Sequence, residues 1–286
     1  MKTVAIIGAN GQLGTDLCEV FANCGWEVRP LLHSEIEVTD QNSVSNILRE
    51  IDFDWVINTS AFHKVDECER NPRRAWEVNS VGQKNVAVVA NSLGKKAVFI
   101  SSDYVFDGES SSPYSVTESV SPVNAYGHSK AGGELATLAS NEKNLVMRIS
   151  SVFGKAGSSG KGGNFIETIL KKGRAGEQLS VVNDITMAPT YTKDAAVILE
   201  VALSKGVSGV IHGANSGEAT WFDFAKYSLE KAGISAEIAP SSTDWSAPLK
   251  RPRYSVLDSA MTTEDIVPVP TWQDAVDRYL AEKGHI

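Results

Sequence analysis

Short apolar runs alternate with longer segments of helical periodicity through the first half of the chain. Uninterrupted apolar runs are typical of strands whose two faces are both covered, and the periodicity between them is that of the covering helices. The expected strands are residues 4–8, 26–31, 54–60, 96–102 and 144–150. The expected helices are residues 12–23, 42–51, 72–92 and 125–140. This alternation predicts right-handed βαβ units, and hence an α/β fold of the Rossmann class with a doubly wound parallel sheet.

The pattern becomes less regular after residue 155. A segment rich in Gly, Ser and Lys, residues 155–164, has the composition of a loop that closes over a ligand. Later elements are expected at residues 179–182, 192–204, 209–215, from about 220 with Thr220 as the N-cap, and 272–283. We therefore predict a dinucleotide-binding Rossmann domain over residues 1–155. A smaller C-terminal α/β substrate lobe is predicted over residues 156–286. The prediction includes the possibility that segments of this lobe are interleaved with the Rossmann domain.

Composition and charge exclude several classes of protein. The chain has 286 residues, of which 42% are hydrophobic and 22% charged, as in ordinary globular proteins. The formal net charge of −8 argues against a nucleic-acid partner. A negatively charged ligand would therefore be held by local backbone amides and a few Arg or Lys side chains, not by a general positive field.

Cysteine usage and hydropathy bear on the cellular compartment. The chain has three cysteines, Cys18, Cys24 and Cys68, and none of them forms a C-x-x-C pair. The odd count predicts neither a disulfide framework nor a structural zinc site, and it fits a reducing compartment. The glycine-interrupted first segment is unlike a signal peptide, and no apolar run reaches membrane-spanning length. We expect a cytoplasmic protein with no membrane partner.

A glycine-rich turn supplies the strongest local signal. Residues 8–14, Gly-Ala-Asn-Gly-Gln-Leu-Gly, directly follow the first expected strand and open the first expected helix. Dinucleotide sites need this context, because the backbone must approach a pyrophosphate and the helix N-terminus must face its charge. The spacing is G-x-x-G-x-x-G, and the alternative interpretation is a plain strand–helix turn.

Tyr126 and Lys130 supply the second signal. They lie four residues apart, so on the expected helix they share one face. A tyrosine with a pKa near ~10 is a poor acid–base catalyst at neutral pH, and a nearby ammonium lowers that pKa. The pair therefore predicts a proton donor to a carbonyl undergoing reduction. Alone, Y-x-x-x-K is most often a solvated helix face, and the preceding glycine-rich turn and alternating strands favour the catalytic interpretation.

A serine at the end of the fourth expected strand is the third signal. Ser102 lies at the carboxyl edge of the predicted sheet, where open parallel sheets bind their ligands. Its hydroxyl is suited to hydrogen-bond a substrate carbonyl beside Tyr126. The alternative is a strand-ending serine followed by an Asx turn at Asp103.

Several longer stretches carry a more specific pattern. They are IIGANGQLG, VDECERNP followed by AWEVNSVGQKNVA, SSDYVFDG, SPVNAYGHSK, GGNFIETIL, APTY, TWFDFAKY and KRPRYSVLD. Together they resemble the extended short-chain dehydrogenase/reductases, and more narrowly the dTDP-4-dehydrorhamnose reductase family. The resemblance runs over nearly the whole chain. It implies NADPH- or NADH-dependent reduction of the 4-keto group of a nucleotide-linked deoxysugar, the last step in making dTDP-L-rhamnose.

The resemblance also implies roles for particular residues. Tyr126 is implied to be the general acid, Lys130 to bind the nicotinamide ribose, and Ser102 to polarise the ketone. The implied cofactor-binding residues are Gly8, Asn10, Gly11, Gln12, Leu13, Gly14, Glu37, Val38, Thr59, Ser60, Ala61, Tyr126 and Lys130. The expected substrate-binding residues are Asp103, Tyr104, Ser151, Asn164, Trp221 and Arg251. The guanidinium fork of Arg251 suits a diphosphate.

Three departures from the family pattern matter. Ser151 stands where the family usually has a tryptophan that lines the sugar site, which leaves the sugar open. Ile185 stands where the family has a polar glutamine. Asp16 and Lys193 stand where some members bind magnesium through glutamates. Because a lysine is not a ligand for a hard cation, we predict no metal at that site.

The end of the second expected strand bears on the choice of dinucleotide. NAD-selective folds often place an acidic residue there for the ribose 2′-hydroxyl. Residues 30–34 contain no acid, and Arg29 and His33 would tolerate a 2′-phosphate. The alternative is that Arg29 is a solvated strand residue, so both NADPH and NADH stay open.

Two other functions stay open as well. Relatives of this fold include non-catalytic NADP-binding regulatory modules, and others are sugar-nucleotide epimerases or dehydratases. The joint presence of Ser102, Tyr126 and Lys130 argues against a pure binding module. The lack of an acidic pair after Ser102 argues against a dehydratase, because Asp103 is followed by Tyr104. The expected partner is a small nucleotide sugar, and a homodimer is an allowed assembly.

Overall fold

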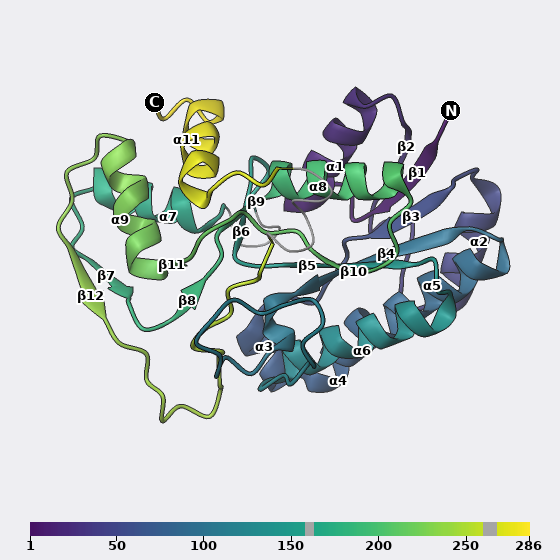
Figure 1. Ribbon diagram of the computed structural model, residues 1–286, viewed down its shortest axis with the longest axis horizontal. Coiled ribbons are helices and arrows are strands. Elements are labelled where there is room, and N and C mark those ends of the chain that lie inside the picture. Colours follow the sequence, from purple (N-terminus) through teal and green to yellow (C-terminus); the bar gives the residue numbers. More distant parts are fainter. Residues whose placement is uncertain (158–162, 260–267) are drawn as a thin grey trace.

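A parallel sheet forms the centre of the computed structural model, which describes residues 1–157, 163–259 and 268–286. Its strands within these ranges are β1 (Thr3–Ile7), β2 (Glu27–Leu31), β3 (Trp55–Asn58), β4 (Lys96–Ser102), β5 (Leu145–Ile149) and β10 (Gly209–His212). They pair in the order β10-β5-β4-β3-β1-β2, and all neighbours are parallel (Figure 1). The predicted doubly wound parallel sheet is confirmed.

Helices cover both faces of this sheet. They are α1 (Gln12–Asn23), α2 (Gln41–Glu50), α5 (Gly82–Ser92), α6 (Ala125–Ser140) and α8 (Thr192–Lys205). Along β1, Val4 and Ile6 join the core beneath α1 and α8, whereas Ala5 and Ile7 join the core beneath α2 and α5. Successive strand side chains point to opposite faces, so two covered faces require apolar residues at every position. No helix of the described residues has the length and hydropathy needed to span a bilayer.

The helix predicted at residues 72–92 contains a π-helical turn in the structure. The segment before α5 consists of α3 (Val65–Arg70), α4 (Pro72–Trp76) and a π-helical turn (Glu77–Val81). Residues 72–92 are therefore helical throughout, as predicted, with one widened turn inside the helix. The widened turn carries Asn79, whose Nδ2 donates to the Phe62 carbonyl and to Ser129 Oγ, both at 2.9 Å. Turns of this kind are frequent near functional sites, and apolar spacing does not reveal them.

A second, smaller core lies beside the sheet, on the left of Figure 1. Its larger elements are α7 (Phe165–Arg174), α9 (Trp221–Lys231), α11 (Trp272–Glu282), β7 (Leu179–Val182) and β12 (Ile238–Ser241). Short strands complete it: β6 (Val152–Phe153), β8 (Thr186–Met187), β9 (Thr190–Tyr191) and β11 (Ala219–Thr220). Thr220 is the N-cap of α9, as predicted, and its Oγ1 accepts a hydrogen bond from Asp223 N at 3.1 Å.

The chain crosses between the two cores more than once. After the first elements of the smaller core, α8 packs against α1 and β10 pairs with β5 in the large sheet. Because β10 is parallel to β5, the chain has to cross over before it enters the sheet again, and it does so after forming part of the smaller core. The two cores are therefore interleaved along the chain beyond residue 155. Of the glycine-rich loop expected at 155–164, residues 158–162 lie outside the described residues.

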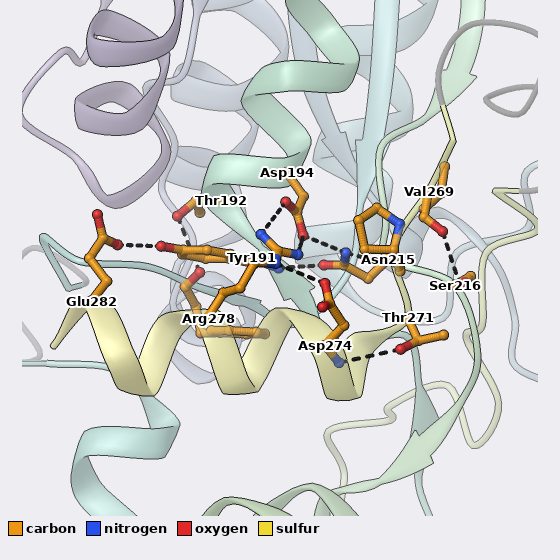
Figure 2. A network of polar contacts seen from close by, with 12 residues as sticks. Tyr191, Thr192, Asp194, Asn215, Ser216, Val269, Thr271, Asp274, Arg278 and Glu282 are labelled. Atoms are coloured by element: carbon orange, nitrogen blue, oxygen red, sulfur yellow. Dashed lines mark hydrogen bonds and ion pairs between the residues drawn. The ribbon is translucent and has the colours of Figure 1, made fainter. Parts of the chain in front are cut away.

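The last helix, α11, is fastened to the start of α8. Arg278 donates from its two terminal nitrogens to the Asp194 carboxylate, at 2.8 and 2.7 Å (Figure 2). Asp194 also accepts from Asn215 Nδ2 at 2.7 Å. One turn further along α11, Glu282 accepts a hydrogen bond from the Tyr191 hydroxyl. Because Asp194 is only 8% exposed, these donors replace the water that its carboxylate has lost.

We expect Arg278→Met to lower the free energy of unfolding by about 1–3 kcal/mol, because Asp194 loses two charge-assisted donors. The lower half of that range is expected, since the Arg278 side chain is 40% exposed. Urea unfolding at pH 7 measures the change. The matched control is Lys226→Met, which removes an exposed contact of 3.9 Å to Glu230 and should cost less than about 0.5 kcal/mol. Equal losses in the two variants would contradict the assignment.

Candidate active site

The glycine-rich turn after β1 folds tightly against its surroundings. Gly8 has a φ of +80°, and a Cβ there would lie 2.5 Å from Thr59 Oγ1. A Cβ at Gly14 would lie 2.2 Å from the Gly8 carbonyl oxygen. Both glycines are therefore required by the packing of the turn and of α1.

Gly11 differs from these two glycines because it borders open space. Among the described residues, and apart from its chain neighbours, a Cβ there would have only the Gly8 carbonyl oxygen within 4 Å, at 3.2 Å. Gly11 caps α1, whose first turn carries no acidic residue. Next to it, Gln12 Oε1 is buried and has no hydrogen-bond partner in the described part of the chain. Space in front of an uncompensated helix N-terminus fits the pyrophosphate of a dinucleotide.

The turn after β3 lies beside the glycine loop. The connections from the neighbouring strands β1 and β3 lead to opposite sides of the sheet, and open α/β sheets bind ligands at such a point. Thr59 Oγ1 donates to the Ile7 carbonyl at 2.8 Å, and Ser60 N donates to Asn58 Oδ1 at 3.0 Å. Thr59, Ser60 and Ala61 therefore follow a strand end that adjoins the glycine loop, where a dinucleotide would lie.

Arg29, on β2, is paired with a carboxylate and does not present a free guanidinium to a 2′-phosphate. Arg29 forms an ion pair with Glu27 on the same strand. Glu37 accepts hydrogen bonds from Thr39 N and Oγ1, at 3.0 and 2.8 Å, and the backbone bond is the main reason why its pKa is lowered. Val38 is buried in the core beneath α2 and α5. This geometry matches the solvated-strand interpretation of Arg29.

Ser102, Tyr126 and Lys130 meet at the carboxyl end of β4. Lys130 lies one turn after Tyr126 on α6 and is 2% exposed. Its Nζ donates to the Ile100 carbonyl oxygen at 2.5 Å and lies 4.2 Å from the ring centroid of Phe99. Ser102 is the last residue of β4, and its hydroxyl lies close enough to Tyr126 to lower the pKa of the phenol. The structure thus brings the three side chains together.

The start of α6 is fixed by its cap and by a close backbone approach. Asn124 Oδ1 accepts from Gly127 N at 2.9 Å, and Asn124 Nδ2 donates to the Lys250 carbonyl at 2.9 Å. A Cβ at Gly127 would lie 2.1 Å from the Tyr104 carbonyl oxygen. The rings of Tyr104 and Tyr126 meet edge to face with centroids 5.7 Å apart. The catalytic helix therefore begins in a defined position against the turn after β4.

Burial sets the proton affinities of this group. It lowers the pKa of Lys130 to about 7, although the Glu134 carboxylate acts in the opposite direction. Burial also raises the pKa of Tyr126, and the hydrogen bond with Ser102 opposes that rise. The expected lowering of the tyrosine pKa by the ammonium is therefore wrong for this structure. Lys130 directs its Nζ to the Ile100 carbonyl, and desolvation of Tyr126 dominates. Tyr126 is held in its protonated form at neutral pH.

Asp103 faces serine hydroxyls and not a ligand cavity. Its Oδ1 accepts from Ser102 Oγ at 2.8 Å, and its Oδ2 accepts from Ser150 Oγ at 2.9 Å and Ser255 Oγ at 2.6 Å. Asp103 is 3% exposed, and burial raises its pKa against the effect of these three bonds. In the structure Asp103 supports Ser102, and its expected contact with substrate stays a prediction. Sequence reasoning missed Ser150 and Ser255, since isolated serines carry no pattern that marks their partners.

Asn164 and Trp221 belong to the smaller core. Asn164 is the N-cap of α7: its Oδ1 accepts from Glu167 N at 3.1 Å, and its Nδ2 donates to the Tyr279 hydroxyl at 2.8 Å. Trp221 packs edge to face on Phe165, with ring centroids 4.7 Å apart. The structure gives Asn164 a capping role and Trp221 a packing role, and their expected substrate contacts stay predictions.

A cavity of about 450 Å³ opens beside Tyr104. Its lining residues are His63, Lys64, Val65, Asp66, Glu67, Arg70, Tyr104 and Arg251. Arg251 Nη2 lies 3.0 Å from Asp66 Oδ2 in this lining. Two of the expected substrate residues, Tyr104 and Arg251, thus lie together. Ser151, just after β5, is outside the lining and has a left-handed φ of +45°.

The positions considered for magnesium belong to a network of charges. Asp16 accepts a hydrogen bond from the Thr192 hydroxyl. Lys193 Nζ lies 3.4 Å from Glu19 Oε1 and 3.2 Å from Glu282 Oε1. Within the residues that the structure describes, no cluster of three or more His, Cys, Asp or Glu side chains is arranged to hold a metal ion. The prediction of no metal at this site stays a prediction.

The chain is similar to one protein family over its whole length. Residues 1–284 match the family model described as the RmlD substrate binding domain. The spore coat polysaccharide biosynthesis protein SpsK of Bacillus subtilis is 34% identical, with 99% of each chain covered. The dTDP-4-dehydrorhamnose reductase of Escherichia coli is 32% identical, with 98% of this chain and 97% of that protein covered. The chain belongs to the dTDP-4-dehydrorhamnose reductase family.

A solved structure of this family bears on the cofactor. The dTDP-4-dehydrorhamnose reductase of Bacillus anthracis, in complex with NADP, is 33% identical and has a TM-score of 0.92, with 99% of this chain and 100% of that chain covered. The family resemblance stated from the motifs is confirmed. Because this relative binds NADP, a nicotinamide dinucleotide is the ligand with which to test the glycine loop.

We expect Gly11→Val to prevent dinucleotide binding without unfolding the protein. Valine would fill the open space in front of α1, and its backbone needs no positive φ because Gly11 has a φ of −76°. Thermal unfolding with and without NADPH measures the effect. The matched control is Gly14→Ala, whose methyl group would collide with the Gly8 carbonyl and should lower the Tm itself. A Gly11→Val protein that NADPH stabilises as much as the parent would rule out this loop as the pyrophosphate site.

Proposed function

We propose that the protein is a reductase of the dTDP-4-dehydrorhamnose reductase type, which uses NADPH or NADH to reduce the 4-keto group of a nucleotide-linked deoxysugar. The observation that carries the proposal is the meeting of Ser102, Tyr126 and Lys130 at the sheet edge that also holds the glycine loop. The names of full-length relatives and the NADP complex of the Bacillus anthracis enzyme support it.

The side chains supply the proton half of ketone reduction. When bound, the nicotinamide supplies the hydride. Tyr126, which burial keeps protonated, donates its phenolic proton to the carbonyl oxygen. Ser102 lies beside that hydroxyl and stabilises the negative charge that develops on the same oxygen. Lys130 has a pKa of about 7 and therefore exchanges protons at neutral pH, and its amine is suited to hold the ribose hydroxyls.

The cavity beside Tyr104 supplies the substrate end of the proposal. Its lining holds three cationic side chains, Lys64, Arg70 and Arg251, against two carboxylates, although the protein as a whole is acidic. The carboxylates are Asp66 and Glu67, which pair with Arg251 and Lys64. The Arg251–Asp66 pair is partly exposed, at 31% and 61%, and such pairs are worth only about 0–1 kcal/mol. A diphosphate, which offers two charges and a bidentate geometry, can therefore displace the Asp66 carboxylate from Arg251.

The alternatives are less well supported by the site. A regulatory binding module has no need of Ser102, Tyr126 and Lys130 at one edge of the sheet. A dehydratase needs a carboxyl group that reaches its substrate, and Asp103 is bonded to serine hydroxyls and is buried. An epimerase of the same superfamily is separated from a reductase by the assay, because only the reductase consumes the dinucleotide stoichiometrically.

The location and assembly of the protein are further parts of the proposal. We place the reaction in the cytoplasm, since the cysteine pattern fits a reducing compartment. Cys18, Cys24 and Cys68 are free thiols in the structure. The homodimer stays a prediction, as does the preference between NADPH and NADH.

We expect Tyr126→Phe to lower kcat by about 10²–10⁴-fold, because the phenolic proton donor is lost while the ring keeps its packing. NADPH binding, followed by fluorescence, should be unchanged. The comparison variant is Tyr104→Phe, which removes the neighbouring hydroxyl from the cavity lining and should act mainly on KM. Near-normal turnover of a 4-keto sugar nucleotide by Tyr126→Phe would contradict the role of this residue.

We expect Ser151→Trp to change the ratio of kcat/KM values among 4-keto sugar nucleotides by about tenfold, since an aromatic face adds contact area beside the sugar. Ser151 has a left-handed φ of +45°, which a bulky residue adopts less readily than serine, so the Tm of the variant is measured beside its kinetics. The parent and the variant are compared on a panel that includes dTDP-4-keto-rhamnose. We favour a parent preference for a bulkier or more hydroxylated sugar. If the parent reduces dTDP-4-keto-rhamnose best and the variant changes nothing, position 151 does not select the sugar.

A further inference from the structure

A segment of the C-terminal half, residues 250–258, runs along the reaction site, and we call it the strap. Its sequence, KRPRYSVLD, is one of the stretches with a family-specific pattern. Its backbone is held from both sides: Tyr114 N donates to the Val256 carbonyl at 2.8 Å, and Ser255 N donates to the Thr186 carbonyl at 2.9 Å. The strap therefore joins the smaller core to the loops around β4.

The strap contacts the reaction site at two further points. The Lys250 carbonyl accepts a hydrogen bond from Asn124 Nδ2, and Asn124 is the N-cap of the helix that carries Tyr126. Arg251 lies in the lining of the cavity beside Asp66. The segment that would hold a diphosphate is thus continuous with the segment that reaches the catalytic groups.

The third contact is made by Ser255. Its hydroxyl donates to Asp103 Oδ2 at 2.6 Å, while Ser102 donates to Oδ1 of the same carboxylate at 2.8 Å. Ser150, which directly follows β5, also donates its hydroxyl to Asp103 Oδ2, at 2.9 Å. All four residues are buried. One carboxylate therefore joins the catalytic serine, the large sheet and the strap.

We propose that Ser255 is a positioning residue, which acts on Ser102 through the Asp103 carboxylate and so links the strap to catalysis. The proposal rests on the reductase function proposed above, in which Ser102 presents its hydroxyl to the ketone.

The number of protons on the Ser102 hydroxyl limits the hydrogen bonds that it can donate. A serine hydroxyl has one proton, and Ser102 directs its proton to Asp103 in this structure. To stabilise the ketone oxygen, Ser102 has to turn that proton away from the carboxylate. A buried carboxylate that loses a donor is costly unless others remain. The donors that remain are Ser150 and Ser255, so they lower the cost of releasing Ser102.

Ser150 and Ser255 contribute differently to this release. Ser150 directly follows β5 and Asp103 directly follows β4, which are paired strands, so this bond forms wherever the strap lies. Ser255 belongs to the strap, so its bond forms only when the strap is in place. Occupation of the cavity through Arg251 therefore favours the arrangement in which Ser102 is free to turn.

The experiment compares Ser255→Ala with the parent in steady-state kinetics across pH. We expect kcat to fall about tenfold while KM stays near the parent value, because the cavity lining is unchanged. The acid limb of the kcat profile should move to higher pH. Burial already raises the pKa of Asp103, and loss of a donor raises it further. Protonation weakens the serine bonds of this carboxylate, so Asp103 no longer fixes the position of Ser102 before its proton turns to the ketone.

The other groups that face Asp103 do not produce this shift. The titratable side chains coupled to it are Tyr104, on the turn after β4, and Tyr126, on α6, and burial raises the pKa of both. They are therefore uncharged across the acid limb. The contacts described from β5 and from the strap are serine hydroxyls.

The matched control is Tyr254→Phe, in the same strap. It removes a hydrogen bond of 2.7 Å to Glu218 and leaves Asp103 untouched, so kcat and the acid limb should match the parent. Ser255→Cys is the second variant, because its thiol keeps the volume of the site but is a weak donor. Parental kcat and acid limb in either Ser255 variant would overturn the proposal, as would an equal loss in Tyr254→Phe.

A measurement without substrate separates this proposal from the proposed function. The titration of the Asp103 carboxyl carbon is followed by ¹³C NMR in the parent and in Ser255→Ala. We expect its midpoint to move to higher pH in the variant whether or not the sugar is correctly identified. An unchanged midpoint overturns the link, whereas a parent that reduces no 4-keto sugar nucleotide overturns the function alone.

Discussion

The parallel direction of the strands is the constraint on which the site depends. Parallel neighbours are joined by crossovers, so the carboxyl ends of β1, β3 and β4 all lie at one edge of the sheet. The loops that follow these ends carry the glycine turn, Thr59 and Ser102. Groups from distant parts of the chain therefore lie close together because their strands end at the same edge of the sheet. The helices add only one further requirement, that α6 presents Tyr126 to the same edge.

Desolvation determines what these groups do once they have met. The Lys130 amine is removed from water and has a folded pKa of about 7, below its usual value. A lowered pKa disfavours the ammonium form, so this lysine destabilises the fold below pH 7. The penalty fades as the pH rises from about 7 towards the ordinary lysine value. Nearby, Arg148 donates to both oxygens of Glu134 at 2.9 and 2.8 Å, so that carboxylate is fully paired and is not the partner of Lys130. The site thus keeps a lysine poised near neutrality at a cost in stability, as functional sites often do.

The sequence was most informative where a feature depends on local spacing. Periodicity located the strands and α1, α6 and α9, because strands covered on both faces and amphipathic helices leave direct patterns. The i, i+4 pair of Tyr126 and Lys130 and the glycine turn were found for the same reason. Spacing could not show where a side chain points. Asn164 caps α7, and Asp103 turns to three hydroxyls, because their partners come from segments up to 152 residues away.

The two cores contribute unequally to the two ligands of the proposed reaction. The glycine loop, Thr59 and Lys130 belong to the Rossmann domain, so a dinucleotide can be held without the smaller core. The cavity is different, because Asp66 comes from α3 and Arg251 comes from the strap. Its shape therefore depends on where the strap lies, and the strap is attached to the smaller core through Thr186. Interleaving the two cores, through α8 and β10, limits how far they can separate. The proton-transfer groups are thus attached to β4 and α6, whereas the cavity is shared between α3 and the strap.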